Sequence, residues 1–380
     1  MHRLEEQIRI RYPPFEAHRW HPEALPMAKE ANHIGDFSTI EDAKQALGKH
    51  GPSFQLGEEN GWMAQRSYTF RGETLNVEHE HSFLETKAYT LPVKRQRRGW
   101  YLVPNPIHSI VRKFINSAVV VLLFALAYLF ISPVLVWFGL PTYGLDTVRW
   151  GLLDYPELAM YVIPLIAAPL LIRIGANLVE LRRQNLFLQR GIAQPSVSFG
   201  CDTVADQSLA IKVMFPQWED DWGEVELMWR VGLLPPSRER LLTSLNRSHN
   251  SQPPPGLSTE LPHHWEAGLD DGTAGGEDAP MERRELKGGF YLRPMRIMAK
   301  SGFVAWKQGE STTLAPISPT WPGTVTTDLL RVHWECVVKI NRKKGGSLLW
   351  VQPLRVAHSS KATTTAAFDL HDGRTELESW

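Results

Sequence analysis

The run Glu78-His79-Glu80-His81 has the residue types and the spacing of a metal site. Residues two apart on a β-strand project from the same face, so His79 and His81 would present two imidazoles side by side. Imidazole nitrogens are common zinc ligands, but a structural zinc site needs two more ligands, and no Cys or His follows at a suitable spacing. His79 and His81 are therefore a candidate metal pair, with a solvated strand face as the alternative.

The remaining nucleophiles do not form a recognisable catalytic set. Cys201 and Cys336 are 135 positions apart in strand-like segments, which is typical of buried thiols in a reducing compartment. His333 is three residues from Cys336 and would lie on the opposite face of a strand. The sequence contains no Walker loop, G-x-S-x-G or H-E-x-x-H motif. We therefore predict no catalytic residue and no cofactor.

Basic side chains gather before the first long apolar run. They are Lys94, Arg95, Arg97, Arg98, Arg112 and Lys113, with no acidic residue between 94 and 113. This close to a bilayer, their natural ligand is an anionic lipid headgroup, although the charge that orients a membrane segment accounts for part of the patch. Nucleic-acid binding is not indicated, because 41 basic residues balance 41 acidic ones and no basic domain is present.

The composition excludes several classes of protein. The chain has 380 residues, of which 43% are hydrophobic, and its mean hydropathy is −0.25. A polytopic carrier would be far more apolar, and a wholly disordered chain would not contain 14 Trp and 15 Phe. We expect two or three domains, with only a small part of the chain in a membrane.

Two apolar segments predict a transmembrane hairpin. Residues 115–139 contain no charge over 25 positions, which is long enough to cross a hydrocarbon core of about 30 Å. Residues 158–174 are 17 long and contain Pro164, Pro169 and Arg173, so a re-entrant or surface-lying segment is the alternative for this stretch. The helix is expected to continue over 177–189 and to end at Gly191.

The charges flanking the hairpin predict its orientation. Ten basic residues against Glu180 alone flank the two segments on one side, whereas the connection 140–157 carries only Arg149 among three acids. Positive flanks stay in the cytoplasm, so we expect an integral membrane protein with two spans and both termini cytoplasmic. The charged N-terminus has no apolar core of a cleavable signal peptide.

The soluble parts are expected to be mainly β. Residues 1–37 show no clear period, a short helix begins at the Ser38-Thr39-Ile40-Glu41 capping box, and strands follow over 54–56, 62–70, 74–80 and 83–93. Alternating strands are also expected over 196–201, 208–215, 222–233, 290–298, 302–307, 332–340 and 348–356. In the strand 332–340, Trp334 and Cys336 are expected to face inward and Glu335 to face solvent.

The last hairpin has a pattern of its own. It reads W-x-C-x-V-x-I, a basic turn, then L-x-x-x-P-L-x-V, and it resembles the last hairpin of arrestin-like or immunoglobulin-like sandwiches, an outline that many unrelated all-β domains share. The fold class expected is therefore a membrane protein with a two-helix transmembrane hairpin plus a mainly β cytoplasmic region, an antiparallel meander and a β-sandwich of immunoglobulin- or arrestin-like outline.

These segments predict the following organisation of the chain. It comprises an N-terminal segment with a short helix (1–50), a meander and basic stretch (51–110), the hairpin (111–176), a juxtamembrane helix (177–192), a β-sandwich (193–358) with a disordered insertion (248–283), and a mobile tail (359–380). A meander this small needs a partner, so it is expected to pack on the sandwich.

Three functions agree with this organisation. The first is a non-enzymatic, membrane-anchored cytoplasmic interaction or scaffold protein, with the bilayer and a protein of unknown identity as partners. The second is an accessory subunit that binds a membrane complex through its hairpin. The third is a membrane-tethered metal-dependent enzyme that uses His79 and His81, which the metal content of the purified protein would distinguish from the other two.

Overall fold

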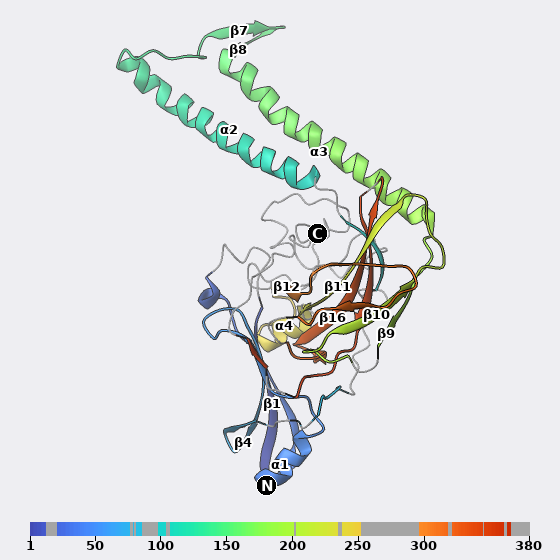
Figure 1. Ribbon diagram of the computed structural model, residues 1–380. Helices are drawn as coiled ribbons and strands as arrows, with labels where there is room; N and C mark the ends of the chain where they lie inside the picture. Colours follow the sequence, from blue (N-terminus) through green and yellow to red (C-terminus); the bar gives the residue numbers. More distant parts are fainter. Residues whose placement is uncertain are drawn as a thin grey trace. The chain divides into compact units, whose positions relative to one another are not determined.

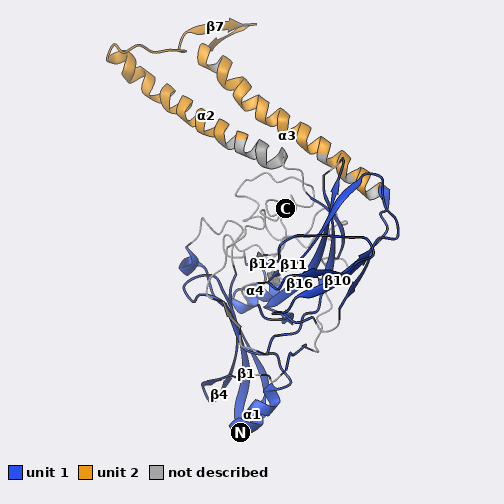
Figure 2. Ribbon diagram, in the orientation of Figure 1, with its two compact units in different colours: residues 1–104, 190–266, 274–380 blue, residues 105–189, 267–273 orange. Residues whose placement is uncertain are grey.

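The computed structural model divides the chain into two compact units (Figure 2). Unit 1 contains residues 1–104, 190–266 and 274–380, and unit 2 contains residues 105–189 and 267–273. The structure describes residues 1–12, 21–76, 79, 81–85, 98–103, 107–200, 203–234, 238–251, 296–317, 321–344, 346–360 and 363–365.

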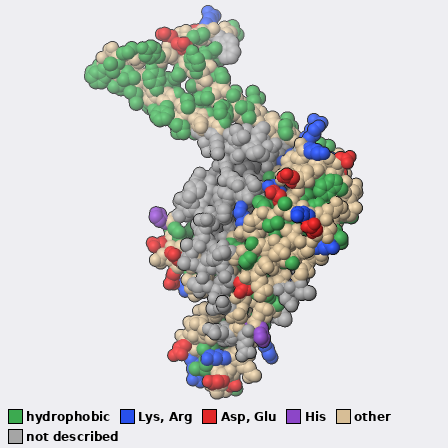
Figure 3. Space-filling view, in the orientation of Figure 1, with side chains coloured by type: hydrophobic (Ala, Val, Ile, Leu, Met, Phe, Trp, Pro, Cys, Tyr) green, Lys and Arg blue, Asp and Glu red, His purple; other side chains and the backbone are tan. Residues whose placement is uncertain are grey.

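Unit 2 is built around two long apolar helices, α2 (Ile107–Trp137) and α3 (Glu157–Arg190). The stretches Ser117–Trp137 and Met160–Phe187 are long and apolar enough to cross a membrane, and few of their described residues are buried. Figure 3 shows hydrophobic side chains over both helices. Pro133, Pro164 and Pro169 lie inside the helices, and α3 continues through 177–189 as predicted.

A short ribbon joins the two helices where a simple loop was expected. Strands β7 (Thr147–Trp150) and β8 (Leu153–Pro156) pair antiparallel, so only two residues form the turn. Gly151 has a φ of 67°, a conformation that favours glycine and suits a two-residue hairpin turn. Gly191, with a φ of 59°, follows the end of α3 as the sequence predicted.

The N-terminal part of unit 1 is a six-stranded sheet with the order β18-β3-β4-β1-β2, and β5 also pairs with β4. Its strands are β1 (His2–Arg11), β2 (Ala28–Phe37), β3 (Phe54–Gly57), β4 (Met63–Phe70), β5 (Glu73–Leu75) and β18 (Thr363–Thr365). Pairing is antiparallel except between β18 and β3. A single 3₁₀ turn, η2 (Pro22–Ala24), precedes β2.

Helix α1 (Ile40–Leu47) covers part of this sheet (Figure 1). The Thr39 hydroxyl accepts a hydrogen bond from the Asp42 amide and so caps the helix, in agreement with the predicted start. Ala43 and Leu47 face inward and form one core with the sheet residues Leu4, Tyr68, Phe70 and Leu75.

The expectation that residues 1–37 lack a regular period is wrong, because they contain β1 and β2. Leu4, Ile8 and Ile10 are buried, and the alternate residues Glu5, Gln7 and Arg9 are more exposed. Glu6 is the second of the four residues on the buried face, and it interrupts the apolar alternation. The pattern therefore has a period of two once a buried carboxylate is allowed at Glu6.

The C-terminal part of unit 1 contains two further antiparallel sheets among the described residues. The smaller has the order β14-β10-β9, and the larger is seven-stranded with the order β12-β11-β16-β17-β6, plus β13 on β11 and β15 on β16. The smaller comprises β9 (Ser196–Phe199), β10 (Leu209–Met214) and β14 (Thr312–Leu314). The larger comprises β6 (Gly99–Leu102), β11 (Trp222–Leu233), β12 (Arg296–Lys300), β13 (Val304–Ala305), β15 (Val325–Thr326), β16 (Arg331–Arg342) and β17 (Leu348–Leu354). A short helix, α4 (Arg238–Ser244), follows β11.

The prediction that one face of this sheet is exposed to solvent is wrong along β11 and β16. Trp334 is buried as expected, but Glu335 and its register partner Arg230 are also 0% exposed. The same face holds a second core of Met228, Val337, Leu349 and Val351, with Tyr101 from β6. Both faces are therefore covered, and the charged residues on the second face pair with each other instead of with water.

Each part of unit 1 contributes a strand to a sheet of the other part. Strand β6, from the N-terminal side of the hairpin, pairs with β17, and β18, from the C-terminal end of the chain, pairs with β3. Both parts therefore lie in one compact unit, and the expected packing of the meander on a β-sandwich stays a prediction. In the tail predicted to be mobile, residues 363–365 form a strand.

Other predictions fall outside the described residues, wholly or in part. They include the insertion 248–283 beyond residue 251, the strand 290–298 before Arg296, most of the tail 359–380, and the strand 83–93 beyond Glu85.

Candidate functional site

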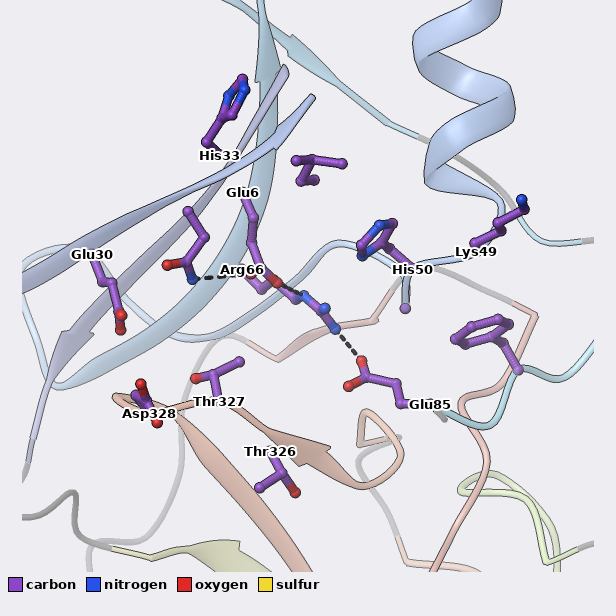
Figure 4. Close-up of a pocket in the computed structure, with 14 residues that line it drawn as sticks. Glu6, Glu30, His33, Lys49, His50, Arg66, Glu85, Thr326, Thr327 and Asp328 are labelled. Atoms are coloured by element: carbon purple, nitrogen blue, oxygen red, sulfur yellow. Dashed lines mark hydrogen bonds and ion pairs between the residues drawn. The ribbon is translucent and has the colours of Figure 1, made fainter. Parts of the chain in front are cut away.

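A pocket of about 480 Å³ lies in unit 1 between the N-terminal sheet and the segment that follows β15. The sheet contributes Glu6, Glu30 and Arg66, and Thr327 and Asp328 come from the turn between β15 and β16. Figure 4 shows Arg66 reaching between two carboxylates, and Glu30 and Asp328 lying near one another. The charged side chains come from segments that are far apart in the sequence.

Arg66 is the centre of the pocket. Its Nε donates to Glu6 Oε1 at 2.7 Å, and its Nη1 donates to Glu85 Oε1. Asn32 Nδ2 donates to the other oxygen of Glu6 at 3.2 Å. Arg66, Glu6 and Glu85 are almost completely removed from solvent, so each charge depends on its partners for stabilisation.

Glu85 links this ion pair to the C-terminal part of unit 1. His358 Nε2 lies 3.4 Å from Glu85 Oε1, and Phe83 and His358 form an isolated antiparallel bridge. The Gly323 amide donates to His358 Nδ1 at 3.0 Å, which leaves Nε2 facing the carboxylate. A Cβ on Gly323 would lie 2.5 Å from the backbone nitrogen of His358 and 2.5 Å from the Val356 carbonyl oxygen, so this close approach of the two backbones requires glycine.

The ionisation of the pocket follows from this geometry. Burial alone would lower the pKa of Arg66, but Glu85, Tyr68 and Glu6 raise it above its ordinary value. Burial alone would raise the pKa of Glu85, but His358 and Arg66 hold it below its ordinary value. Both side chains are therefore charged at neutral pH.

Acidification is expected to remove the contribution of Glu85 to stability. The pKa of Glu85 is lower in the folded chain than in the unfolded chain, where it is about 4.3. The contribution of Glu85 to stability is therefore complete above the unfolded pKa, and it is lost as the pH falls through the folded pKa. In urea titrations at a series of pH values, the stability difference between wild type and Glu85→Gln should shrink below about pH 4.3. Glu5→Gln, at an exposed pair, is the control. A difference that stays constant with pH would contradict the assignment.

The outer part of the pocket is acidic. Burial, and then the carboxylate of Asp328, raise the pKa of Glu30, while Arg240 forms an ion pair with Asp328 at 2.6 Å. The Thr327 hydroxyl donates to the Leu330 carbonyl and accepts from the Leu330 amide, so it is held in its own turn. The buried side chains Arg66, Glu6 and Glu85 thus bind one another, an arrangement suited to holding segments together.

The structure describes both residues of the predicted metal pair, His79 and His81. Strand β5 ends at Leu75, so His79 and His81 do not lie in the expected strand, and the same-face argument does not apply to them. His79 stacks on Phe83 at 5.2 Å, and burial, followed by His358 and Arg66, lowers its pKa. His81 is exposed. Among the residues that the structure describes, no group of three or more His, Cys, Asp or Glu could hold a metal ion.

The structure describes the predicted headgroup patch only in part. Arg98 is exposed at the start of the segment that leads into β6. Lys94, Arg95 and Arg97 lie outside the described residues, and so do the side chains of Arg112 and Lys113 in α2. Of the two cysteines, Cys336 is buried, and burial followed by Glu335 raises its pKa, while Cys201 lies outside the described part.

Neither the family models nor the curated proteins searched contain a match to this chain.

Proposed function

We propose that this chain is a non-enzymatic interaction or scaffold protein that is anchored in a membrane by α2 and α3. The observation that carries the proposal is the exposure of the apolar stretches Ser117–Trp137 and Met160–Phe187. Apolar surface of this extent is too large to face water in a soluble monomer, and each stretch is at least as long as a bilayer core requires.

The proposed orientation places both termini in the cytoplasm. Its support is the excess of Lys and Arg before α2 and after the apolar part of α3, compared with three acids and Arg149 in the connection 140–157. The short ribbon of β7 and β8 is then the part of the chain outside the cytoplasm.

Reporter fusions test this topology. A reporter that is active only in the cytoplasm is expected to work when fused at residue 1 or at residue 380, and to fail when inserted near Tyr143, because the connection would be translocated. Cytoplasmic activity at 143 would contradict the hairpin. Western blotting of each fusion controls for expression.

The rest of the proposal assigns interactions to the β-rich part. The charges of the Arg66 pocket are engaged in joining the two ends of unit 1, which favours a binding scaffold over a catalytic centre.

We further propose that the C-terminal part of unit 1 is a β-sandwich of immunoglobulin- or arrestin-like outline. Two indoles support it. Trp229 Nε1, in β11 of the larger sheet, donates at 2.7 Å to the carbonyl of Ala315, just after β14 of the smaller sheet. Trp306 Nε1, just after β13, donates at 3.1 Å to the carbonyl of Val213 in β10.

One observation on α3 favours the alternative of an accessory subunit that binds a membrane complex through its helices. Gly175 is exposed, and a Cβ added there would meet no atom within 4 Å, so unit 2 itself does not require glycine at this position. Small residues allow close approach of another helix. Purification in mild detergent of the full chain and of Gly175→Leu separates the two proposals, since only a partner bound through the helices would be lost from the variant.

A further inference from the structure

The connection between α2 and α3 is fixed at both of its ends within unit 2. The Tyr128 hydroxyl, on α2, donates to the Tyr143 carbonyl at 2.9 Å and accepts from the Tyr143 amide at 2.8 Å. At the start of α3, the Glu157 amide donates to the Asp146 carbonyl at 2.7 Å. The segment before β7 is thus tied to the two helices, and it sets the position of the ribbon that β7 and β8 form.

The ribbon is attached directly to α3. Strand β8 ends at Pro156, α3 begins at Glu157, and the apolar stretch of α3 begins at Met160, three residues further along, a rise of about 5 Å. The headgroup layer extends roughly 5–7 Å beyond the hydrocarbon on each side of a bilayer. A spanning α3 therefore brings the base of the ribbon into that layer. Figure 1 shows the ribbon crossing the start of α3 instead of continuing along its axis.

The ribbon has one apolar and one polar face. Its register pairs Val148 with Tyr155 and Arg149 with Asp154. Directly opposite residues of an antiparallel pair share a face, and successive residues of a strand alternate between faces. Val148, Leu153 and Tyr155 therefore lie on one face, which we call the apolar face. Arg149 and Asp154 lie on the other, which we call the polar face.

The described part of the chain leaves the apolar face largely uncovered. Val148 is 39% exposed, Leu153 is 60% exposed, and Leu152 in the turn is 94% exposed. Among the described residues, β7 and β8 form a sheet of two strands only. An isolated two-stranded ribbon is at best marginally stable in water. The ribbon therefore needs another surface to cover its apolar face.

We propose that the apolar face, together with Leu152, lies in the interface of the bilayer that α2 and α3 span, and that the polar face is turned to water. The bilayer already adjoins the base of the ribbon, and a phenol such as that of Tyr155 favours the interface. A protein partner fits less well, because four apolar side chains cover far less than the roughly 800 Å² that each partner buries in a stable interface. The proposal rests on the proposed membrane anchoring, and it adds that the connection lies on the membrane instead of projecting from it.

The test measures the surroundings of spin labels on the full chain in phosphatidylcholine nanodiscs. In a Cys201→Ser background, Leu153→Cys and Asp154→Cys each place one nitroxide, on opposite faces of β8. Cys336 is buried and should not react. Collisions with oxygen, which concentrates in the bilayer, are compared with collisions with a water-soluble nickel chelate. The ratio of oxygen to nickel accessibility should be roughly threefold higher at 153 than at 154.

A second pair of labels, at Val148→Cys and Arg149→Cys, repeats the comparison in β7, because the loss of Leu153 could itself disturb the ribbon. A label at Leu152→Cys in the turn then tests what holds the ribbon. Adding Val148→Asp with Leu153→Asp should roughly double the nickel accessibility at 152, whereas adding Arg149→Ser with Asp154→Ser should leave it unchanged. If the two aspartates have no effect, the apolar face does not hold the ribbon on the bilayer and the proposal is wrong.

A label at Leu126→Cys, an exposed position on α2, separates this proposal from the proposed function. If oxygen reaches 126 but the nickel chelate reaches 148 and 153 as readily as 149 and 154, membrane anchoring stands and the docking of the ribbon is overturned. If 148 and 153 are shielded from both reagents, a protein covers the apolar face, either a partner or a second copy, and the docking on lipid is again overturned. If the nickel chelate reaches 126, α2 is not in the bilayer and both proposals fail.

Discussion

Replacing Arg66 by Met is expected to lower the free energy of unfolding by about 3–5 kcal/mol. The substitution keeps much of the side-chain volume but removes the cation between Glu6 and Glu85. Both carboxylates are nearly inaccessible to solvent, so each would be left buried without its principal opposite charge. Urea unfolding of the full chain in detergent, followed by tryptophan fluorescence, measures the loss.

The control for this experiment is Arg3→Met. Arg3 pairs with Glu5 on the same strand as Glu6, but its side chain is 66% exposed, so the change should be below about 1 kcal/mol. Adding Glu6→Gln and Glu85→Gln to Arg66→Met should recover part of the loss, since neutral amides are less costly to bury than unpaired carboxylates. If Arg66→Met and Arg3→Met lower the free energy of unfolding equally, the buried ion pairs of Arg66 do not stabilise the fold more than an exposed pair does.

The long helices were predictable from the sequence because their signal is local. Twenty-five uncharged positions in succession require no knowledge of what the helix meets. The capped start of α1 and the glycine after α3 are equally local, and both were placed correctly. Most of the C-terminal strands also followed from alternation, as in β10, where Leu209, Ile211 and Val213 are buried.

The Arg66 pocket was not predictable, because its partners meet only through the tertiary fold. Glu6 and Arg66 are 60 residues apart, and Glu85 meets His358 from the far end of the chain. Glu6 is also the reason why β1 was not predicted, because a carboxylate at an inward position interrupts the apolar alternation of the strand. The sequence does contain one indication, but it can be recognised only once the pairing of β1 with β4 is known. Each of these two strands carries one charged residue on its inward face, and the two charges have opposite signs.

The same limitation explains the wrong expectation for Glu335. Alternation predicted a solvated side chain whose replacement would change stability by less than about 0.5 kcal/mol. The structure buries Glu335 completely against Arg230, whose Nε donates to Glu335 Oε1 at 2.6 Å. His333 lies 3.2 Å from its other oxygen. Alternation identifies the two faces of a strand, but it does not show whether the second face is also covered.

Glu335→Ala is therefore expected to lower the free energy of unfolding by about 3–5 kcal/mol, because it leaves the buried guanidinium of Arg230 without its carboxylate. The double variant Arg230→Met with Glu335→Leu should recover most of this loss, since apolar side chains of similar volume suit a face that already holds Met228 and Val337. Urea unfolding at neutral pH measures all three proteins.

The matched control is Glu226→Ala on the same face of the sheet. Glu226 pairs with Lys339 at 3.1 Å, but its side chain is partly exposed, so water can replace the lost contact and the change should stay below about 1 kcal/mol. A small effect of Glu335→Ala, comparable to that of Glu226→Ala, would mean that water reaches Arg230 and that the second face of the sheet is open. A large effect that the double variant does not relieve would instead assign Glu335 a role beyond its pairing with Arg230.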